Sequence, residues 1–405
     1  MKVVFLSDDF PPASFGGAGI STFELAIEVK KAGHEVCIIT TCRSAQDAGE
    51  SEYEGLKVIN IASDYHERWR AWVSLYNPPV VQEIKSLLKE LKPDVVHANN
   101  IHKYLSYHCL KVAKQNTKVV VWTARDAMSI SYGKLATSRY LQNRDSRVSW
   151  IDQVRQAGKR YNPFRDFFIK YYLDYADVKL SVSKALAETL AQNGIKGVKT
   201  LHTGMSIGAW HISADTVRQF KERHGISHKK VILFGGRLGA GKEAMQAMQL
   251  VNRALPDAVL VVMGKGENAE KMRSAVGELS VVFTGWISGE EKVAAYHASD
   301  VVWVPSTYFD AFPRSALEAS VSGKPVVATI FGGASELVQE GRTGYIVNPL
   351  HPEEVADKTI ELLQDKKKAV SLGSAGRGRV EKEFNIQDKA SELLGYYQTL
   401  LSKNS

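Results

Sequence analysis

Cysteine is scarce in this sequence, and its scarcity excludes two common ways of stabilising a small fold. The chain has only three cysteines, Cys37, Cys42 and Cys109. An odd number without a C-x-x-C pair supports neither a disulfide framework nor a thiolate zinc site. We therefore expect a protein of the reducing cytosol.

Long hydrophobic runs are also missing from the sequence. The segment Met1–Leu6 is shorter than the ~7 to 15 apolar residues of a signal peptide, so no export is expected. The run Ala258–Gly264 falls far short of the ~20 residues that cross a bilayer. We expect a cytoplasmic protein without a membrane span.

The composition excludes a disordered or collagen-like chain, because 44% of the residues are hydrophobic, 24% are charged and only 12 are prolines. A length of 405 residues exceeds the ~250 to 300 residues of a single core, so two domains are expected. The net charge of +8 is dispersed and no nucleic-acid motif is present. Nucleic acid is therefore not an expected partner.

Short β-branched runs alternate with amphipathic segments along the whole chain, a pattern typical of an α/β fold with doubly wound parallel sheets. Strands are predicted in the first half at 3–6, 35–40, 95–97 and 119–122 and in the second half at 230–234, 258–263, 280–283, 301–304 and 325–329. The glycine-containing segment Leu201–Gly208 reads as a hinge. We therefore predict two domains, 1–205 and 206–385, with a ligand site at the carboxyl ends of their strands.

A first glycine-rich loop follows the first predicted strand. It contains Gly16 and Gly17 and leads into a helix predicted over Thr22–Ala32, with Ser21 as its N-cap. Backbone amides at a helix N-terminus suit a phosphate, although the loop lacks G-x-G-x-x-G spacing. A mere tight turn is the alternative.

A second glycine-rich loop follows the strand at 230–234. Gly236 and Arg237, with Lys242 a few residues later, place two cations at a strand-to-helix turn, which suits a diphosphate. The spacing resembles a P-loop, but Glu243 stands where that loop needs Ser or Thr to hold magnesium. A solvated basic turn is the alternative.

Two carboxylates eight residues apart form a third candidate site. Asp310 precedes a helix predicted to begin near Ser315, and Glu318 lies in the first turn of that helix. Carboxylates accept hydrogen bonds from sugar hydroxyls, and amides at a helix start donate to phosphate, so the segment predicts a nucleotide-sugar site. Acidic helix capping is the alternative. The remaining candidate binding residues are Phe312, Pro313, Arg314, Ser315 and Ala316.

These segments together resemble glycosyltransferase family 4, the group 1 retaining glycosyltransferases of GT-B fold, over nearly the whole chain. The resemblance depends on the Gly16-Gly17 loop, on Gly236-Arg237 with Lys242, and on Asp310-x7-Glu318 as a version of an E-x7-E motif. It extends to two further segments, Gly323–Ala328 and Gly332–Leu337.

The resemblance implies transfer of a hexose from a UDP-, GDP- or ADP-sugar to a glycan, lipid-linked or small-molecule acceptor, with retained anomeric configuration. It implies that Arg237 and Lys242 hold the diphosphate, Glu318 the ribose, Asp310 the hexose, and the Gly17 amide a phosphate. It further implies that a C-terminal helix, predicted here over 386–405, returns to the first domain. No cofactor or metal is expected, and the sequence has no Asp-x-Asp and no clustered His and Cys.

Two residues depart from the family pattern. Asp310 replaces the usual Glu, which shortens its reach, and Arg125 stands where related enzymes commonly have a His before Asp126. Arg125 cannot act as a general base, but it can pair with Asp126 or with an acidic sugar or phosphate. His102, in an Asn-Ile-His segment of the kind found in a subset of the family, is a candidate for the acceptor side together with Arg125 and Asp126.

The stretch 138–174 combines eight Lys and Arg residues with eight aromatic ones. We expect it to pack as a helical excursion on the first domain, and contact with an anionic bilayer at the inner face of the membrane is the alternative. Two other functions stay open for the whole chain. They are a sugar phosphorylase or synthase of the same architecture and a non-catalytic nucleotide-sugar or polysaccharide-binding protein.

Overall fold

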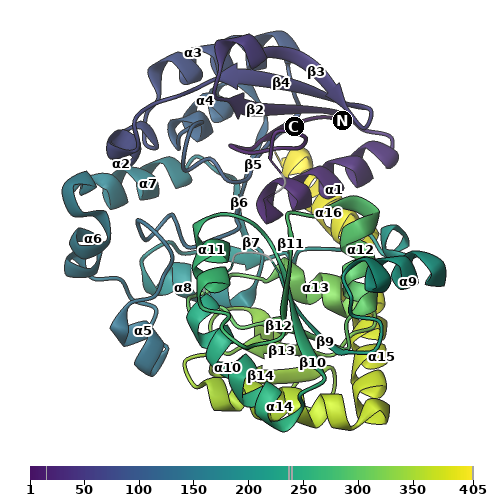
Figure 1. Cartoon of the computed structure of the whole chain (residues 1–405). Coiled ribbons are helices and arrows are strands. Elements are labelled where there is room, and N and C mark those ends of the chain that lie inside the picture. Colours follow the sequence, from purple (N-terminus) through teal and green to yellow (C-terminus); the bar gives the residue numbers. More distant parts are fainter. Residues whose placement is uncertain (15, 236–237, 239, 404–405) are drawn as a thin grey trace. The chain divides into compact units, whose positions relative to one another are not determined.

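The computed structural model describes residues 1–14, 16–235, 238 and 240–403. The chain divides into two compact units, Met1–Gly204 with the segment from Ile386 onward, and Met205–Asn385. Each unit has its own sheet and its own core, and Figure 1 labels their elements. The predicted α/β class with two mainly parallel sheets is confirmed.

The first unit contains an eight-stranded sheet with the order β3-β4-β2-β1-β5-β6-β7-β8. All neighbouring strands are parallel except β3 and β4, which form an antiparallel pair. The strands are β1 (Lys2–Leu6), β2 (Glu35–Cys42), β3 (Gly49–Tyr53), β4 (Leu56–Ala62), β5 (Val95–Ala98), β6 (Val119–Ala124), β7 (Val178–Ser181) and β8 (Val198–Thr200).

Helices cover the faces of this sheet, and β5 and β6 are therefore buried along their whole length. This burial explains why these strands read as continuous apolar runs in the sequence. The helices are α1 (Gly17–Lys31), α2 (Arg70–Val73), α3 (Pro78–Leu91), α4 (His108–Asn116), α5 (Ser138–Asn143), α6 (Trp150–Ala157), α7 (Arg165–Leu173), α8 (Lys184–Gln192) and α16 (Ile386–Lys403).

The core of the first unit joins the two ends of the chain. Leu25 and Val29 from α1 share one buried cluster with Leu393 and Tyr397 from α16. Helices α1 and α16 contact each other, as Figure 1 also shows. The last helix is thus an integral part of this unit's core.

The start of α1 differs from the prediction. The helix begins at Gly17 with Gly16 as N-cap, and Ser21, the predicted cap, is buried inside the helix. A Cβ at Gly19 would lie 3.0 Å from the carbonyl oxygen of Asp9. Small residues therefore let this first turn approach the preceding backbone closely, which the cap pattern could not indicate.

The second unit contains a six-stranded parallel sheet with the order β11-β10-β9-β12-β13-β14. The strands are β9 (Lys230–Gly235), β10 (Ala258–Met263), β11 (Val281–Gly285), β12 (Val301–Val304), β13 (Val326–Thr329) and β14 (Gly344–Val347). The helices are α9 (Ala214–Arg223), α10 (Gly241–Ala254), α11 (Glu267–Ser274), α12 (Gly289–Ala298), α13 (Arg314–Val321), α14 (Pro352–Gln364) and α15 (Lys366–Glu383).

Trp303 on β12 belongs to the core of the second unit and is fully buried. Its indole nitrogen donates a hydrogen bond of 2.7 Å to the Thr359 hydroxyl on α14. The polar atom of this large side chain is thereby satisfied within an otherwise apolar cluster. Helices α10 and α14 are thus held against a sheet whose strands β9, β12 and β13 lead directly into the candidate loops.

Candidate functional site

Glu318 lies on α13, and its carboxylate is buried. The helix begins at Arg314, one residue before the predicted start, so Glu318 is its fifth residue and lies just beyond the first turn in which it was predicted. Lys292 Nζ lies 2.8 Å from Glu318 Oε1, and Arg314 Nε lies 3.1 Å from the same oxygen. The Tyr296 hydroxyl donates to Glu318 Oε2 at 2.9 Å. Two cations and one hydroxyl therefore converge on this single carboxylate.

These partners decide the charge of Glu318. Burial raises the pKa of its carboxyl, but the charges of Lys292 and Arg314 and the hydrogen bonds from Lys292 and Tyr296 outweigh it. The net pKa lies below the ordinary value of a glutamate, so the group is ionised at neutral pH. A carboxylate has about four acceptor positions, and three described donors leave about one for a further hydroxyl.

Sequence reasoning missed Lys292 and Tyr296. Both lie on α12, one helical turn apart. The Trp210 ring packs beside them: its centre lies 5.4 Å from the centre of the Tyr296 ring and 5.3 Å from Lys292 Nζ. They precede Glu318 by 26 and 22 residues. The only local signal is their i, i+4 spacing on an alanine-containing helix, which also fits an ordinary half-buried face.

Asp310 lies in the loop before α13, where the backbone of Gly332 and Gly333 approaches it. The Gly333 amide donates to the Asp310 carbonyl at 2.8 Å, and Ser306 Oγ donates to Asp310 Oδ2 at 3.1 Å. Gly332 has φ +95°, and a Cβ there would lie 1.9 Å from the Asp310 carbonyl oxygen. The Gly332-Gly333 pair therefore fixes the position of Asp310 through close backbone contact.

The predicted donor segment between Asp310 and Glu318 is mostly engaged within its own unit. The Phe312 ring contacts the Phe384 ring at 5.6 Å, and Pro313 is the N-cap of α13. The Ala316 amide donates to the Pro313 carbonyl at 3.1 Å. Arg314 and Ser315 are partly exposed beside them.

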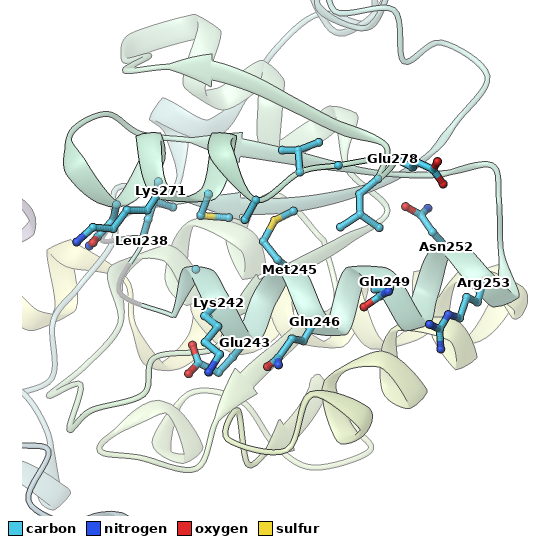
Figure 2. Close-up of a pocket in the computed structure, with 17 residues that line it drawn as sticks. Leu238, Lys242, Glu243, Met245, Gln246, Gln249, Asn252, Arg253, Lys271 and Glu278 are labelled. Atoms are coloured by element: carbon cyan, nitrogen blue, oxygen red, sulfur yellow. The ribbon is translucent and has the colours of Figure 1, made fainter.

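Lys242 lies in a different environment. It is exposed in the first turn of α10 and lines an open groove of about 1000 Å³ between α10 and α11. Figure 2 shows Lys242, Glu243 and Gln246 along α10, with Lys271 on α11. The described lining of the groove includes neither Asp310 nor Glu318. Gly236 and Arg237, the other predicted members of this loop, lie outside the described residues.

In the first unit, the predicted glycines Gly16 and Gly17 form the exposed start of α1. His102, Arg125 and Asp126 come together at the carboxyl ends of β5 and β6, around a small cavity. His102 Nε2 lies 3.7 Å from Asp126 Oδ2. Arg125 Nε donates to Asn99 Oδ1 at 2.9 Å, so Asn99 is one partner of Arg125.

Asp8, a buried residue that sequence analysis did not select, holds the segment carrying His102. Its carboxylate accepts the backbone amides of Lys103, Tyr104 and Leu105 at 2.7 to 2.8 Å. Burial raises the pKa of Asp8, and a nearby His102 and the three amides oppose that rise. Its place directly after the first strand was the only signal in the sequence.

The stretch 138–174 packs only in part. Tyr140 and Tyr172 are buried as expected, but Trp150, Phe164 and Phe167 are 69%, 59% and 67% exposed. The stretch forms the helices α5, α6 and α7 of the first unit, as expected, but these three rings do not pack against it. No helix in the described ranges has the length and apolar character needed to cross a membrane. Nor do the described residues include a cluster of three or more His, Cys, Asp or Glu suited to a metal ion.

Comparison with known proteins gives matches over both halves of the chain. A family model described as Glycosyltransferase Family 4 matches residues 15–207, and one described as Glycosyl transferases group 1 matches residues 216–379. A glycogen synthase of Mycobacterium tuberculosis is 24% identical, with 98% of this chain and 94% of that protein covered. A GDP-mannose-dependent alpha-mannosyltransferase of the same organism is 24% identical, with 100% and 98% covered.

Solved structures share the fold. Sucrose-phosphate synthase from Thermosynechococcus elongatus has a TM-score of 0.78 and 21% identity, covering 99% of both chains. The Anabaena protein HepE in complex with UDP and glucose has a TM-score of 0.73 and 16% identity, covering 98% of this chain and all of that one. The predicted GT-B architecture with two Rossmann-like domains is thereby confirmed.

Proposed function

This chain belongs to the group 1 glycosyltransferases of family 4, and from that premise we propose that it is a retaining, metal-independent hexosyltransferase using a nucleotide-sugar donor. The observation that carries the proposal is the ionised Glu318 on α13, held by Lys292, Arg314 and Tyr296. Relatives named as GDP-mannose-dependent mannosyltransferases, and a structural neighbour in complex with UDP and glucose, support this class of donor.

In the proposed reaction the second unit binds the donor and the first unit binds the acceptor. The bond from the anomeric carbon to the diphosphate breaks, and its electron pair leaves on the diphosphate. Lys242 and Arg237 stabilise that charge. Glu318 accepts a hydrogen bond from a ribose hydroxyl, and Asp310 accepts one from a hexose hydroxyl. The acceptor oxygen attacks the same face and gives its proton to a diphosphate oxygen.

Removal of the Glu318 charge is the direct test of this proposal. We expect Glu318→Gln to lower kcat/KM for transfer by about 10² to 10³-fold, since a group that positions the donor is lost. Tyr296→Phe removes one hydrogen bond but keeps the charge, and we expect a smaller loss. Purified variants are assayed for transfer with a panel of UDP-, GDP- and ADP-sugars, with and without EDTA.

Glu290→Gln, an exposed carboxylate on α12, is the matched control and should retain activity. A thermal melt shows whether each variant is folded, because Glu318→Gln leaves two cations with a weaker partner. Near-wild-type turnover by folded Glu318→Gln would refute the assignment. Turnover only with phosphate or a sugar 1-phosphate would favour the phosphorylase alternative, and donor binding without transfer or hydrolysis would favour a binding protein.

We propose further that the exposed aromatic face of α6 and α7 binds an anionic bilayer. Trp150 and Val154 lie one turn apart on α6. Phe164 is the N-cap of α7, and Phe167 and Tyr171 lie one turn apart within that helix. Exposed Arg155 and Lys159 lie in the same segment. Aromatic rings that insert at the headgroup level and cations that attract anionic lipids fit this one kind of surface.

Vesicle co-sedimentation tests the bilayer proposal. At low salt the protein should pellet with vesicles containing about 30% phosphatidylglycerol but not with pure phosphatidylcholine, since the attraction is electrostatic. Phe164→Ser with Phe167→Ser should weaken binding at least about tenfold, because two inserting rings are lost. Trp286→Ser, which changes an exposed tryptophan in the second unit, should have no effect. A wild-type protein that stays in the supernatant at low salt would end this proposal.

A further inference from the structure

The cavity at the carboxyl ends of β5 and β6 contains two buried polar atoms without a hydrogen-bond partner among the described residues. They are the amide nitrogen of Asn99, which is fully buried, and the hydroxyl of Ser129, which is 4% exposed. Most buried polar groups in native proteins are hydrogen-bonded, and an unpaired one costs about 1 to 3 kcal/mol. Two such atoms lining one cavity therefore indicate that something polar belongs there.

The orientation of Asn99 is set by its neighbour. Its side-chain oxygen accepts a hydrogen bond from Arg125 Nε at 2.9 Å, so the amide nitrogen is the atom left over. An amide nitrogen can only donate, whereas the Ser129 hydroxyl can donate or accept. The occupant must therefore present an acceptor atom to Asn99.

The charged residues around the cavity favour a negatively charged acceptor atom. Arg125 carries a permanent positive charge, and His102 lies beside it in the same lining. The carboxylate of Asp126 opposes them, but one of its oxygens accepts the Met128 amide at 2.9 Å and the other lies 3.7 Å from His102 Nε2. Asp126 is thus already engaged on its own side of the cavity.

The size of the cavity limits what can enter. Its volume of about 10 Å³ is about what one water molecule needs, so it admits one oxygen atom rather than a whole sugar ring. Arg125 and Asp126, both partly exposed, form its accessible side. An anionic group attached to a larger molecule can therefore place one oxygen inside while the rest stays outside.

We propose that this cavity binds one oxygen of an anionic group, a carboxylate or a phosphate, carried by the acceptor sugar. Asn99 and Ser129 donate to that oxygen, and Arg125 neutralises the group. The inference deepens the proposed transferase function by assigning an acidic acceptor class, and it depends on the first unit being the acceptor side. It also gives Arg125 a role that depends on a permanent positive charge, which the histidine of related enzymes does not carry.

Binding measurements test this assignment independently of catalysis. Glucuronate, glucose 6-phosphate and glucose are titrated into the intact protein at equal ionic strength, and binding is followed by ligand-observed NMR. We expect binding of at least one of the two anionic sugars and much weaker binding of glucose. Preference for glucuronate or for glucose 6-phosphate identifies which anionic group is the source of the oxygen.

Ser129→Ala separates a ligand site from a purely structural one. Removing a hydroxyl that is unpaired in the free protein should leave the melting temperature unchanged or raise it, while the affinity for the preferred anionic sugar falls about fivefold or more. Ser131→Ala is the matched control, because that hydroxyl is buried but bonded to the Ala127 and Gly133 carbonyls. It should lower the melting temperature and leave the affinity unchanged.

Arg125→Gln should abolish the preference for anionic over neutral sugars, whereas Arg125→Lys should retain part of it. A resident water alone would give the opposite result for Ser129→Ala, namely a lower melting temperature and no change in sugar binding. That result, or equal binding of glucose and the two anionic sugars, would overturn the assignment. Anion-selective binding in a protein without transferase activity would refute the proposed function but keep the site.

Discussion

At the scale of single residues, His97 shows how strongly a buried position changes an ionisable group. It lies on β5, with Nδ1 2.6 Å from the Tyr397 hydroxyl and Nε2 2.7 Å from the Thr123 hydroxyl. Burial, and then the charge of Arg125, lowers the pKa of His97 to about 3. The imidazole is therefore neutral at all physiological pH values and connects α16 to the sheet.

The depressed pKa of His97 predicts a loss of stability in acid. In the unfolded chain this residue takes up a proton near pH 6.5, whereas in the folded chain it does so only near pH 3. The unfolded state is thus favoured as pH falls through that window, by about 2 kcal/mol between pH 7 and pH 5. Urea denaturation at pH 7, 6 and 5 measures this loss.

His97→Gln is the comparison for that experiment. It should be less stable than wild type at pH 7, but the difference between the two proteins should shrink as the pH falls. Other groups, including Asp8 with its raised pKa, contribute equally to both proteins and cancel in the difference. Parallel profiles for the two proteins would show that His97 does not titrate as inferred.

At the scale of elements, glycines decide how closely two helices of the second unit approach each other. On α15, Gly373 faces the chain just after α13, and a Cβ at this position would lie 2.0 Å from the Gly323 carbonyl oxygen. Gly378 lies on the same helix with nothing within 4 Å of an added Cβ. The packing of α13, which carries Glu318, therefore depends on one of these glycines and not on the other.

The two glycines should respond oppositely to the same substitution. Gly373→Ala should destabilise the protein by about 1 to 3 kcal/mol or more, because backbone must move to admit the methyl group. Gly378→Ala should be neutral or stabilising by up to about 1 kcal/mol, since alanine favours an exposed helix. Thermal melts of both variants test this, and equal effects would mean that the close contact at Gly373 is relieved without cost.

At the scale of the whole molecule, the first unit is built from both ends of the chain. Ile386 passes close to Gly204, because a Cβ added at Gly204 would lie 2.6 Å from the Ile386 Cα. From that crossing, α16 places Leu393 and Tyr397 in the core beside the first strands. The second unit requires no segment from elsewhere in the chain, because its sheet and its core come from one continuous segment.

This organisation predicts different outcomes for isolated fragments. Residues 205–385 should fold cooperatively alone, whereas residues 1–204 should lack a cooperative thermal transition, because several buried contacts are missing from the core. Adding residues 386–405 as a peptide should restore the transition. Circular dichroism melts of the fragments measure this, and a stable fold of 1–204 alone would show that α16 is dispensable.

The elements that the sequence predicted best are those whose pattern is local. Buried parallel strands such as β5 and β6 read as apolar runs, and α13 could be placed by its loop chemistry to within one residue. Two of the missed strands have little apolar pattern, since β3 is mostly exposed and β8 has only three residues. Their pairing partners, rather than their own residues, make them strands. The other missed strands, β4, β7 and β14, do contain buried apolar residues, so their own sequence carried a signal that the prediction left unused.

The candidate site divides in the same way. The sequence by itself determined that Asp310 and Glu318 belong to one loop and helix start, because both are close in the chain and local rules govern that turn. Only the tertiary structure decided which side chains meet them: Lys292 and Tyr296 reach Glu318 from another helix, and Asn99 and Ser129 share a cavity with Arg125. Contacts between residues far apart in sequence depend on how whole elements pack, and a pattern of neighbouring residues does not predict that packing.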